Sequence, residues 1–183
     1  MSVATEVVGD AKKKEKKMLS KHLWYSSAIM GHSQHYRVEL DYIQIKYKKL
    51  TDDAIPPHKE EGNIGWDFHT TVGQEVCLYP GERFKFPTGI ALEIPSGYAM
   101  MLWDRSGLSS KEGLHRLAGV IDSVYRGEII VCLTNLGLEP VIVKPGQKII
   151  QGIIQEEIPT KMIEAEDLSE TSRGTKGFGS TGN

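Results

Sequence analysis

The amino-acid sequence predicts an all-β protein of the sandwich or barrel type. Short apolar or alternating segments recur between about residues 38 and 158, and turn signals that contain glycine or proline separate them. No segment in this part of the chain has the length and the helical period of a full-length helix. The turn signals are Pro56-Pro57, Glu61-Gly62, Pro80-Gly81, Pro87, Pro95-Ser96-Gly97, Gly137 and Pro145-Gly146.

Six segments carry the strand pattern. The first, VELDYIQIKYKKL at residues 38–50, alternates and places Ile43, Ile45 and Tyr47 on one face. The other five are residues 89–94, 98–103, 128–135, 140–144 and 148–155. We predict that these segments form one β domain over residues 38–158.

A lysine run, KKKEKK at residues 12–17, distinguishes the first 37 residues from the rest. After it, Met18, Leu19, Leu23 and Trp24 recur at loosely helical spacing. We predict a solvated helix or a frayed extension for residues 1–37, because a charge run of this kind is usually a solvated surface. A nucleic-acid arm, a nuclear-import signal and a helix that docks on an unknown partner are the alternatives, and nothing in the segment decides between them.

The last region, residues 159–183, continues an acidic linker into a glycine-rich end. Six carboxylates lie between residues 156 and 170, against a single Lys161. The final stretch, TSRGTKGFGSTGN, cannot bury enough apolar surface to order itself, since glycine loses the most backbone freedom on folding. We therefore predict a mobile linker that carries a flexible C-terminal arm.

The bulk properties favour a single-domain protein of the cytosol. The 183 residues carry a formal net charge of −2, which gives no general attraction to nucleic acid or to a membrane surface. Cys77 and Cys132 lie far apart in apolar segments, so buried free thiols in a reducing compartment are favoured over a disulfide. The sequence has no Cys/His cluster typical of zinc, no apolar run long enough to cross a bilayer and no recognisable signal peptide. We expect a cytoplasmic enzyme or binding protein; a nuclear location is the alternative for a eukaryotic or viral protein.

Two stretches place polar residues where strand periodicity does not require them. Arg105, Ser106 and Gly107 follow an apolar strand, and an arginine, a hydroxyl and a glycine-freed backbone N–H suit phosphate oxygens. Residues 117–133 read as a β-hairpin, with Asp122 next to its turn and Tyr125 three residues further on. Such a carboxylate is a candidate general base beside a ring on which a ligand could stack. The alternative is that Asp122 only caps the turn and Tyr125 only packs on the hairpin.

Together with the tail, these stretches resemble one protein family. NIGWDF, DRSGLS, GVIDSVYRGEI, KPGQKIIQ and RGTKGFGSTG stand in the order and approximate spacing of the five motifs of trimeric dUTPases, over roughly residues 42–183. The resemblance implies a jelly-roll-like, distorted β-barrel that forms homotrimers, with three active sites at the subunit contacts, each closed by a C-terminal arm. It also implies Mg²⁺-dependent hydrolysis of dUTP to dUMP and pyrophosphate, which limits uracil incorporation into DNA and supplies dUMP for dTMP synthesis.

The third motif implies how the nucleoside is recognised. By resemblance, Asp122 would orient and deprotonate the water that attacks the α-phosphorus. Tyr125 would lie against the deoxyribose and leave no room for a 2′-hydroxyl. Backbone groups of Gly119, Val120 and Ile121 would pair with the uracil edge, and a mismatched base would leave those buried groups unpaired.

The first, second and fourth motifs imply the phosphate end of the site. Arg105, Ser106 and Gly107 would bind phosphate oxygens, and Gln151 would hydrogen-bond near the α-phosphate. Mg²⁺ would chelate the triphosphate and keep several waters. Asp67 would contact that hydration shell or brace the site, and the two roles have equal weight.

The fifth motif implies how the C-terminal arm would contact the nucleotide. Arg173 would reach the terminal phosphates, Phe178 would stack over uracil, and Ser180 with Thr181 would bond the γ-phosphate. Gly179 and the other glycines would let backbone N–H groups approach the phosphates. An arm that orders only on closure would exclude water and complete the site.

The sequence departs from the family pattern at five positions. Lys176 replaces a glycine of the fifth motif, Ser109 an alanine of the second and Val124 a frequently acidic residue of the third. The fourth motif has Gln147 and Lys148 where Asp-Arg is common, which puts turn stability and a subunit contact in question. No departure removes a group with a direct chemical role.

Two alternative functions remain open at this point. A dCTP deaminase shares the fold, but needs a glutamate in a differently built motif and fits the third motif and the glycine-rich arm poorly. A regulator with this fold that binds a protein partner belongs to a different class, and residues 1–37 have no catalytic task in the scheme above.

Overall fold

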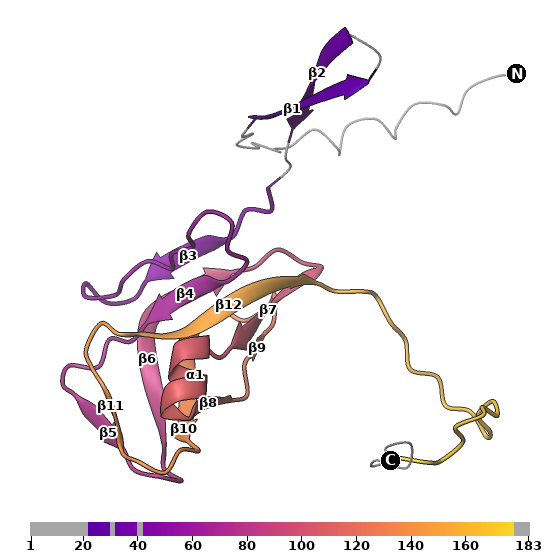
Figure 1. Cartoon of the computed structure of the whole chain (residues 1–183). Coiled ribbons are helices and arrows are strands. Elements are labelled where there is room, and N and C mark those ends of the chain that lie inside the picture. The colour runs from indigo at the N-terminus through magenta and orange to yellow at the C-terminus, as the bar shows by residue number, and fades with distance from the viewer. Residues whose placement is uncertain (1–21, 30–31, 40–41, 178–183) are drawn as a thin grey trace, which may run out of the picture.

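The computed structural model describes residues 42–177 in full and the backbone of residues 22–29 and 32–39. Within these described residues the strands pair antiparallel throughout, and a single short helix is present. The predicted all-β class is therefore confirmed (Figure 1).

Two four-stranded sheets form the body. The first has the order β3–β6–β10–β8, and the second has the order β4–β12–β7–β9. A separate two-stranded ladder joins β5 to β11. The bounds are β3 (Lys46–Lys49), β4 (Trp66–His69), β5 (Val76–Leu78), β6 (Arg83–Glu93), β7 (Tyr98–Trp103), β8 (Leu114–Leu117), β9 (Val120–Ile121), β10 (Glu128–Asn135), β11 (Val141–Val143) and β12 (Lys148–Glu156).

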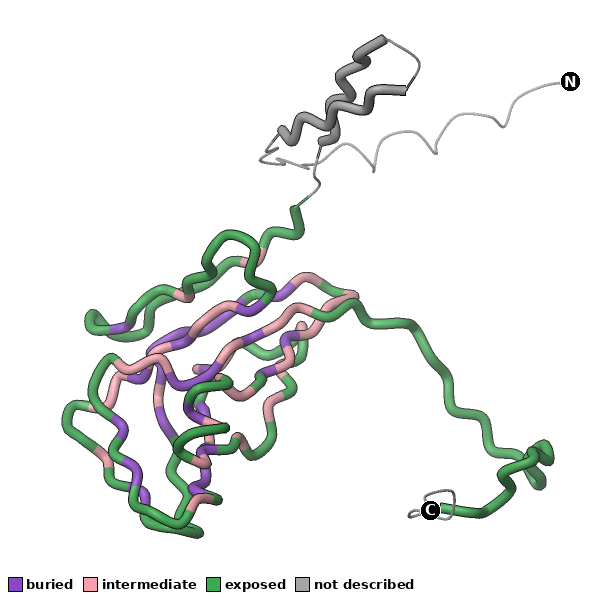
Figure 2. Tube along the Cα trace, in the orientation of Figure 1, coloured by how far each residue is buried: buried purple, intermediate pink, exposed green. Residues whose placement is uncertain are grey.

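Side chains of both sheets fill one hydrophobic core. Phe86 and Ile129 come from the first sheet, Phe68 and Ile150 from the second, and each is at most 1% exposed. Burying a side chain of this size stabilises the fold by about 1.5–3 kcal/mol, so the core strands are fixed by their apolar faces. Figure 2 shows the buried residues along these strands and an exposed chain beyond β12.

The first strand of the body is shorter than predicted. Residues 38–50 were expected to form one strand, but only Lys46–Lys49 pair with β6, and Val38 and Glu39 belong to another strand. Alternation alone does not make a strand, because a partner must also satisfy its backbone.

An antiparallel hairpin, β1 (His22–Ile29) with β2 (His32–Glu39), precedes the body. The helical interpretation of Leu23 and Trp24 is therefore wrong, while residues 12–19 lie outside the described residues. The two strands are two residues apart in the sequence, the commonest hairpin spacing, and they are rich in aromatic residues. Pairing with a neighbouring strand outweighs a loose helical period.

A short helix, α1 (Ser106–Glu112), follows β7 and includes the candidate phosphate ligands Ser106 and Gly107. It ends at Gly113, whose φ of 75° lies in the left-handed region and whose N–H donates to Ser109 O. A Cβ on Gly113 would lie 2.5 Å from the backbone nitrogen of Gly137. Both the backbone conformation and the close approach require glycine here.

Gly113→Ala is expected to lower the free energy of unfolding by about 2–3 kcal/mol, since it adds a backbone contact to an unfavourable φ. Gly97→Ala is the matched control, because Gly97 has a φ of 85° and open space around it. The control should lose only about 1 kcal/mol in urea unfolding. Equal losses in the two variants would contradict the role of the Gly137 contact.

The predicted hairpin at residues 117–133 is wrong in part, because its outgoing strand divides between the two sheets. Leu117 in β8 pairs with Cys132 in β10, but Val120 in β9 pairs with Met101 in β7. Ala118 and Gly119 between them have φ values of 67° and 129°. Two successive positive φ angles turn the chain from one sheet to the other, so β9 and β10 diverge.

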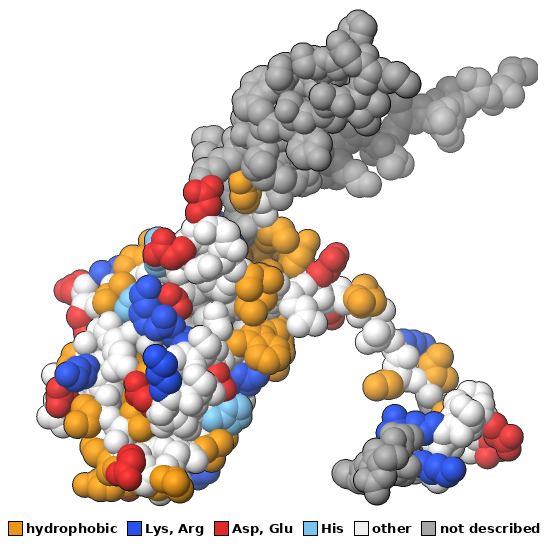
Figure 3. All heavy atoms as spheres, in the orientation of Figure 1, with side chains coloured by type: hydrophobic (Ala, Val, Ile, Leu, Met, Phe, Trp, Pro, Cys, Tyr) orange, Lys and Arg blue, Asp and Glu red, His pale blue; other side chains and the backbone are white. Residues whose placement is uncertain are grey.

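Residues 157–177 extend beyond the body with neither helix nor strand, and all are exposed. They include Ile158, Met162 and Ile163, which are 78%, 99% and 79% exposed. Figure 3 shows apolar side chains along this tail. Within the part of the chain that the structure describes, no helix has the length and apolar character needed to cross a membrane.

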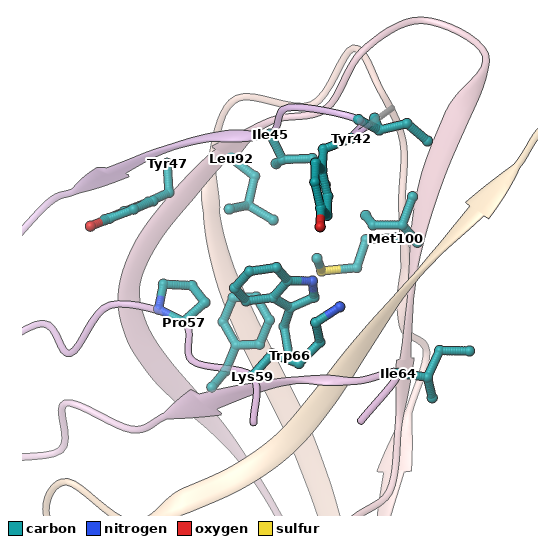
Figure 4. A pocket seen from close by; sticks show the side chains of 12 residues that line it. Tyr42, Ile45, Tyr47, Pro57, Lys59, Ile64, Trp66, Leu92 and Met100 are labelled. Atoms are coloured by element: carbon teal, nitrogen blue, oxygen red, sulfur yellow. The ribbon is translucent and has the colours of Figure 1, made fainter. Parts of the chain in front are cut away.

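An apolar groove with a volume of about 550 Å³ lies beside β3. Figure 4 shows Tyr42, Trp66, Leu92 and Met100 around it, with Lys59 Nζ 5.2 Å from the Trp66 ring centroid. Tyr42, Ile43 and Tyr47 in the groove lining are 45%, 47% and 52% exposed. Apolar surface of this kind usually marks a contact with another molecule.

Both cysteines are free thiols, as predicted. Their predicted burial is wrong for Cys77, which is exposed on the short strand β5, and Cys132 is half-buried.

Candidate functional site

A polar cavity of about 410 Å³ opens where α1, β4 and β12 meet. It brings together five residues that the sequence analysis selected, although they come from distant parts of the chain: Asp67, Arg105, Ser106, Gly107 and Gln151. The first turn of α1 supplies Ser106 and Gly107, and both are exposed. The remaining lining residues are Asn63, Gly65, Leu108, Lys111 and Glu112.

Asp67 is held between two cations. Its Oδ1 lies 3.1 Å from Arg105 Nε, and its Oδ2 lies 3.1 Å from Lys148 Nζ. Arg105 also donates from Nη1 to the Lys148 carbonyl at 3.2 Å. Because the Asp67 side chain is only 20% exposed, this ion network fixes the direction of the Arg105 guanidinium.

The same geometry bears on whether Asp67 could contact a magnesium ion directly or through water. Mg²⁺ keeps several waters and takes few protein carboxylates when a phosphate chelates it. Each Asp67 oxygen already faces a cation but retains a second lone pair, which can accept a hydrogen bond from a metal-bound water. The described residues contain no group of three or more His, Cys, Asp or Glu side chains that could hold a metal by themselves. The residues present thus fit an indirect role for Asp67.

Gln151 is fixed by two contacts. Its Nε2 donates to the Asp104 carbonyl at 2.8 Å, which leaves the side-chain oxygen as the free acceptor of the amide. The opposite wall is the buried Gly65, where a Cβ would lie 2.7 Å from Gln151 Oε1. A larger residue at position 65 would therefore displace the amide.

The departures at Gln147 and Lys148 leave the turn of the fourth motif closed. Gln147 Oε1 accepts a hydrogen bond from Lys144 N at 2.8 Å, and Gln147 O accepts one from Thr70 N at 3.0 Å. Glutamine thus closes the turn before β12. Lys148 is the second cation on Asp67, a role that sequence reasoning missed.

A second cavity of about 250 Å³ lies between the diverging strands β9 and β10. The predicted residues Gly119, Val120 and Ile121 line one side, and Ile130, Val131 and Cys132 line the other. β9 is the edge strand of its sheet, so one side of its backbone is not paired with any described strand. Backbone donors and acceptors are therefore available beside a narrow cavity.

Asp122 and Tyr125 lie on the turn that follows β9, and both side chains are exposed. Tyr125 N donates to Asp122 O at 3.1 Å, and the Tyr125 hydroxyl donates to Glu128 O at 2.9 Å. Gly127 allows this ring position, because a Cβ there would overlap the Tyr125 hydroxyl and ring. Asp122 thus projects from a turn whose shape other groups determine.

Glu128 anchors this turn and was not found by sequence reasoning. Its Oε1 accepts hydrogen bonds from Gly89 N at 2.7 Å and Thr88 N at 3.1 Å. These bonds join the end of the turn to β6, which crosses the centre of the first sheet. A glutamate within an apolar strand is the signal that could have indicated such an anchor.

His69 lies next to the ion network on β4. Burial lowers the pKa of His69, and the positive charge of Lys148 lowers it further. Its Nδ1 is buried and has no hydrogen-bond partner among the described residues. The imidazole is therefore neutral at pH 7.

Acidification is expected to destabilise the protein through His69. The unfolded chain takes up this proton near pH 6.5, whereas the folded chain takes it up only at a lower pH, so stability falls as pH decreases below about 6.5. In urea unfolding at pH 7.5 and 5.5, His69→Gln should show a smaller loss than the wild type. The exposed His58 provides the control variant His58→Gln. An unchanged pH dependence in His69→Gln would contradict this prediction.

The described part of the C-terminal tail, up to Gly177, does not reach either cavity within one chain. Arg173 is exposed on the tail, and its Nε donates to Lys176 O at 2.9 Å. Figure 1 shows this tail running away from the body. Phe178, Gly179, Ser180 and Thr181 lie outside the described residues.

A β-barrel-like body with a polar cavity rich in phosphate-type donors, beside a narrow cavity lined by backbone, is typical of a nucleotide-binding protein. The family model for dUTPase matches residues 51–182. The chain belongs to the dUTPase family.

Sequence relatives and solved structures agree with this assignment. The chain is 44% identical over 140 residues to the deoxyuridine 5′-triphosphate nucleotidohydrolase of Caldanaerobacter subterraneus subsp. tengcongensis, a match that covers 73% of this chain and 95% of the relative. The enzyme of that name from Thermoanaerobacter sp. is also 44% identical, over 146 residues, with 76% and 98% covered.

Among solved structures, a mutant dUTPase of Staphylococcus bacteriophage 80alpha with dUpNHpp aligns with a TM-score of 0.69 and 26% identity, and covers 76% of this chain and 99% of its own. This likeness confirms the jelly-roll-like β fold.

Proposed function

We propose that this protein hydrolyses dUTP to dUMP and pyrophosphate. The observation that carries the proposal is the pairing of two kinds of cavity on one chain. One gathers Arg105, Ser106 and Gln151, and the other exposes the backbone of residues 119–121 beside Asp122. Membership of the dUTPase family supports this assignment.

The narrow cavity is suited to a pyrimidine base. Fixed backbone groups at Gly119–Ile121 would pair with the uracil edge, and cytosine would leave a buried donor or acceptor unpaired. Tyr125, held by Glu128, would pack against the deoxyribose and exclude a 2′-hydroxyl. Selectivity for deoxyuridine therefore depends on rigid main chain and on one ring.

The polar cavity is suited to the triphosphate. Phosphoanhydride hydrolysis requires an oriented water and stabilisation of charge on the phosphates. Arg105 and Ser106 would bind phosphate oxygens, and Gln151 would hydrogen-bond near the α-phosphate. Mg²⁺, when bound to the triphosphate, would supply further charge neutralisation, with Asp67 accepting hydrogen bonds from its waters. Asp122 would take the proton from the attacking water and orient it towards the α-phosphorus.

The active unit that we propose is a homotrimer with sites where the subunits meet. The two cavities have no lining residue in common, and the described part of the tail leads away from the body (Figure 1). The apolar groove beside β3 and the exposed Ile158, Met162 and Ile163 give each chain apolar surface that a second copy could cover. This surface supports assembly, which would bring the arm of one chain to the cavities of others.

Light scattering coupled to size-exclusion chromatography is expected to give a mass close to three times the chain mass of 20.4 kDa. The measurement should be made at the concentration used for the activity assay. A monomeric mass together with full activity would overturn the trimeric site.

A pyrophosphate-release assay tests the proposed function. Purified protein is incubated with dUTP, dCTP, dTTP and UTP, each with and without Mg²⁺, and ammonia release is followed in parallel. We expect pyrophosphate from dUTP alone and a strong dependence on Mg²⁺. Ammonia from dCTP would indicate a deaminase instead, and no turnover of any nucleotide would favour a regulator with this fold.

A further inference from the structure

Arg116 forms a bridge between Trp103 and the backbone next to the narrow cavity. Its guanidinium carbon lies 5.1 Å from the centroid of the Trp103 ring, in a cation–π contact. Its Nη1 donates a hydrogen bond to the carbonyl oxygen of Ala118 at 2.6 Å. Neither Trp103 nor Arg116 has a role in the site described above.

The residue that receives this bond has an unfavourable backbone conformation. Ala118 has a φ of 67°, and it is the only non-glycine residue with a positive φ in the part of the chain that the structure describes. In an L-residue the Cβ makes this conformation costly, so surrounding contacts must maintain it. The next residue, Gly119, has its carbonyl bonded by Leu102 N at 2.7 Å. Two successive carbonyls are thus held, one by β7 and one by Arg116.

Arg116 is itself held in place from two sides. Its backbone N–H donates to Asp104 Oδ1 at 2.9 Å, while Asp104 Oδ2 lies 2.6 Å from His115 Nδ1. The guanidinium lines the narrow cavity and packs against Gly119, where a Cβ would lie 3.2 Å from Nη1. The cation therefore sits at the point where the chain leaves β8 for β9.

We propose that Arg116, stacked on Trp103, is a positioning residue for the base cavity. It stabilises the left-handed conformation of Ala118, which keeps β9 apart from β10 and presents the backbone of residues 119–121 to the base. This inference rests on the proposed function, because it takes the narrow cavity to be the uracil site. In this inference, base recognition by the backbone depends on a side chain that does not itself pair with the base.

The main test uses Arg116→Met, which keeps an unbranched side chain but removes the charge and the donor. The dissociation constant of dUMP, measured by calorimetry, is expected to rise about tenfold, as is the KM for dUTP, while kcat falls by less than about threefold. The preference for dUTP over dCTP, as a ratio of kcat/KM, should fall as well. Trp103→Leu should weaken dUMP binding by about threefold, since it removes only the ring face.

A rescue variant separates positioning from general stability. Glycine adopts a positive φ without steric cost, so Ala118→Gly removes the strain that Arg116 offsets. In the double variant Arg116→Met/Ala118→Gly, dUMP affinity should return to within about threefold of the wild type. Arg83→Met on the exposed end of β6 is the control, and it should bind dUMP as the wild type does.

The outcomes distinguish this inference from the proposed function. If the wild type hydrolyses dUTP and Arg116→Met binds dUMP normally, the inference is wrong and the function stands. A large fall in kcat accompanied by a rise in KM, without rescue by Ala118→Gly, would also overturn the inference, because that pattern indicates a general structural role. A wild type that neither binds dUMP nor hydrolyses dUTP would overturn both. If Arg116→Met does not fold, dUMP affinity should be compared between Trp103→Leu and the double variant Trp103→Leu/Ala118→Gly, which provides the same test.

Discussion

Asp122→Asn is expected to retain dUTP binding and to lose most hydrolysis, by a factor of about 10²–10⁴. Asparagine has nearly the shape of aspartate but cannot accept the proton of the attacking water. The turn that carries residue 122 is closed through backbone groups and the Tyr125–Glu128 bond, so the substitution should not move it. Single-turnover pyrophosphate release and dUTP affinity should both be measured, because the prediction is that the rate falls while the affinity is retained.

The matched control for this prediction is Asp53→Asn, which removes an exposed carboxylate from the loop after β3. It should hydrolyse dUTP at the wild-type rate. Near-normal turnover by Asp122→Asn would show that this carboxylate is not the general base.

Truncation after Ser172 is expected to leave a folded protein of unchanged oligomeric state with activity reduced by about 10²-fold or more. The removed residues include Arg173 and the glycine-rich end, and none of the described residues of this segment, 173–177, belongs to the core. Without the arm, water would enter the site and the terminal phosphates would lose their contacts. The melting temperature should change little, since the described tail residues are exposed.

Two measurements check the truncation result. Light scattering reports assembly, and turnover with saturating dUTP reports catalysis. A variant of full length in which Gly-Ser repeats replace residues 173–183 should be as inactive as the truncated form. If the truncated protein unfolds, the arm is a structural element and its role as a lid is wrong.

The sequence predicted the central strands well, because their signal is local. The apolar runs at residues 98–103, 128–135 and 148–155 lie in strands of the two sheets, and the run at 89–94 lies in β6 up to Glu93, although β6 begins at Arg83 and continues through Pro87, which had been interpreted as a turn signal. The errors occur where the partner of a segment decides its structure. Leu23 and Trp24 form a strand through pairing with β2, and Val120 and Ile121 pair with β7 and not within the expected hairpin. The pattern of residues along the sequence does not show with which other segment a strand will pair.

The motifs selected residues of the candidate site, but they did not indicate the residues that hold those side chains in place. Arg105, Ser106, Gly107 and Gln151, which the motifs selected, line one cavity together with Asp67. Lys148, in contrast, reaches Asp67 across a separation of 81 positions in the chain, and no local pattern indicates that contact. Supporting residues of this kind are defined by three-dimensional proximity, and their types vary with the local packing.

The change of sheet at Ala118 and Gly119 bears on how this protein could be inhibited. If a uracil-like compound binds through the main chain of residues 119–121, few single substitutions would remove its hydrogen bonds, because every amino acid except proline supplies the same amide group. Escape from such a drug would require the strand to move, and under the proposed function the binding of the natural nucleotide would depend on that strand position too. Resistance would therefore carry a loss of fitness.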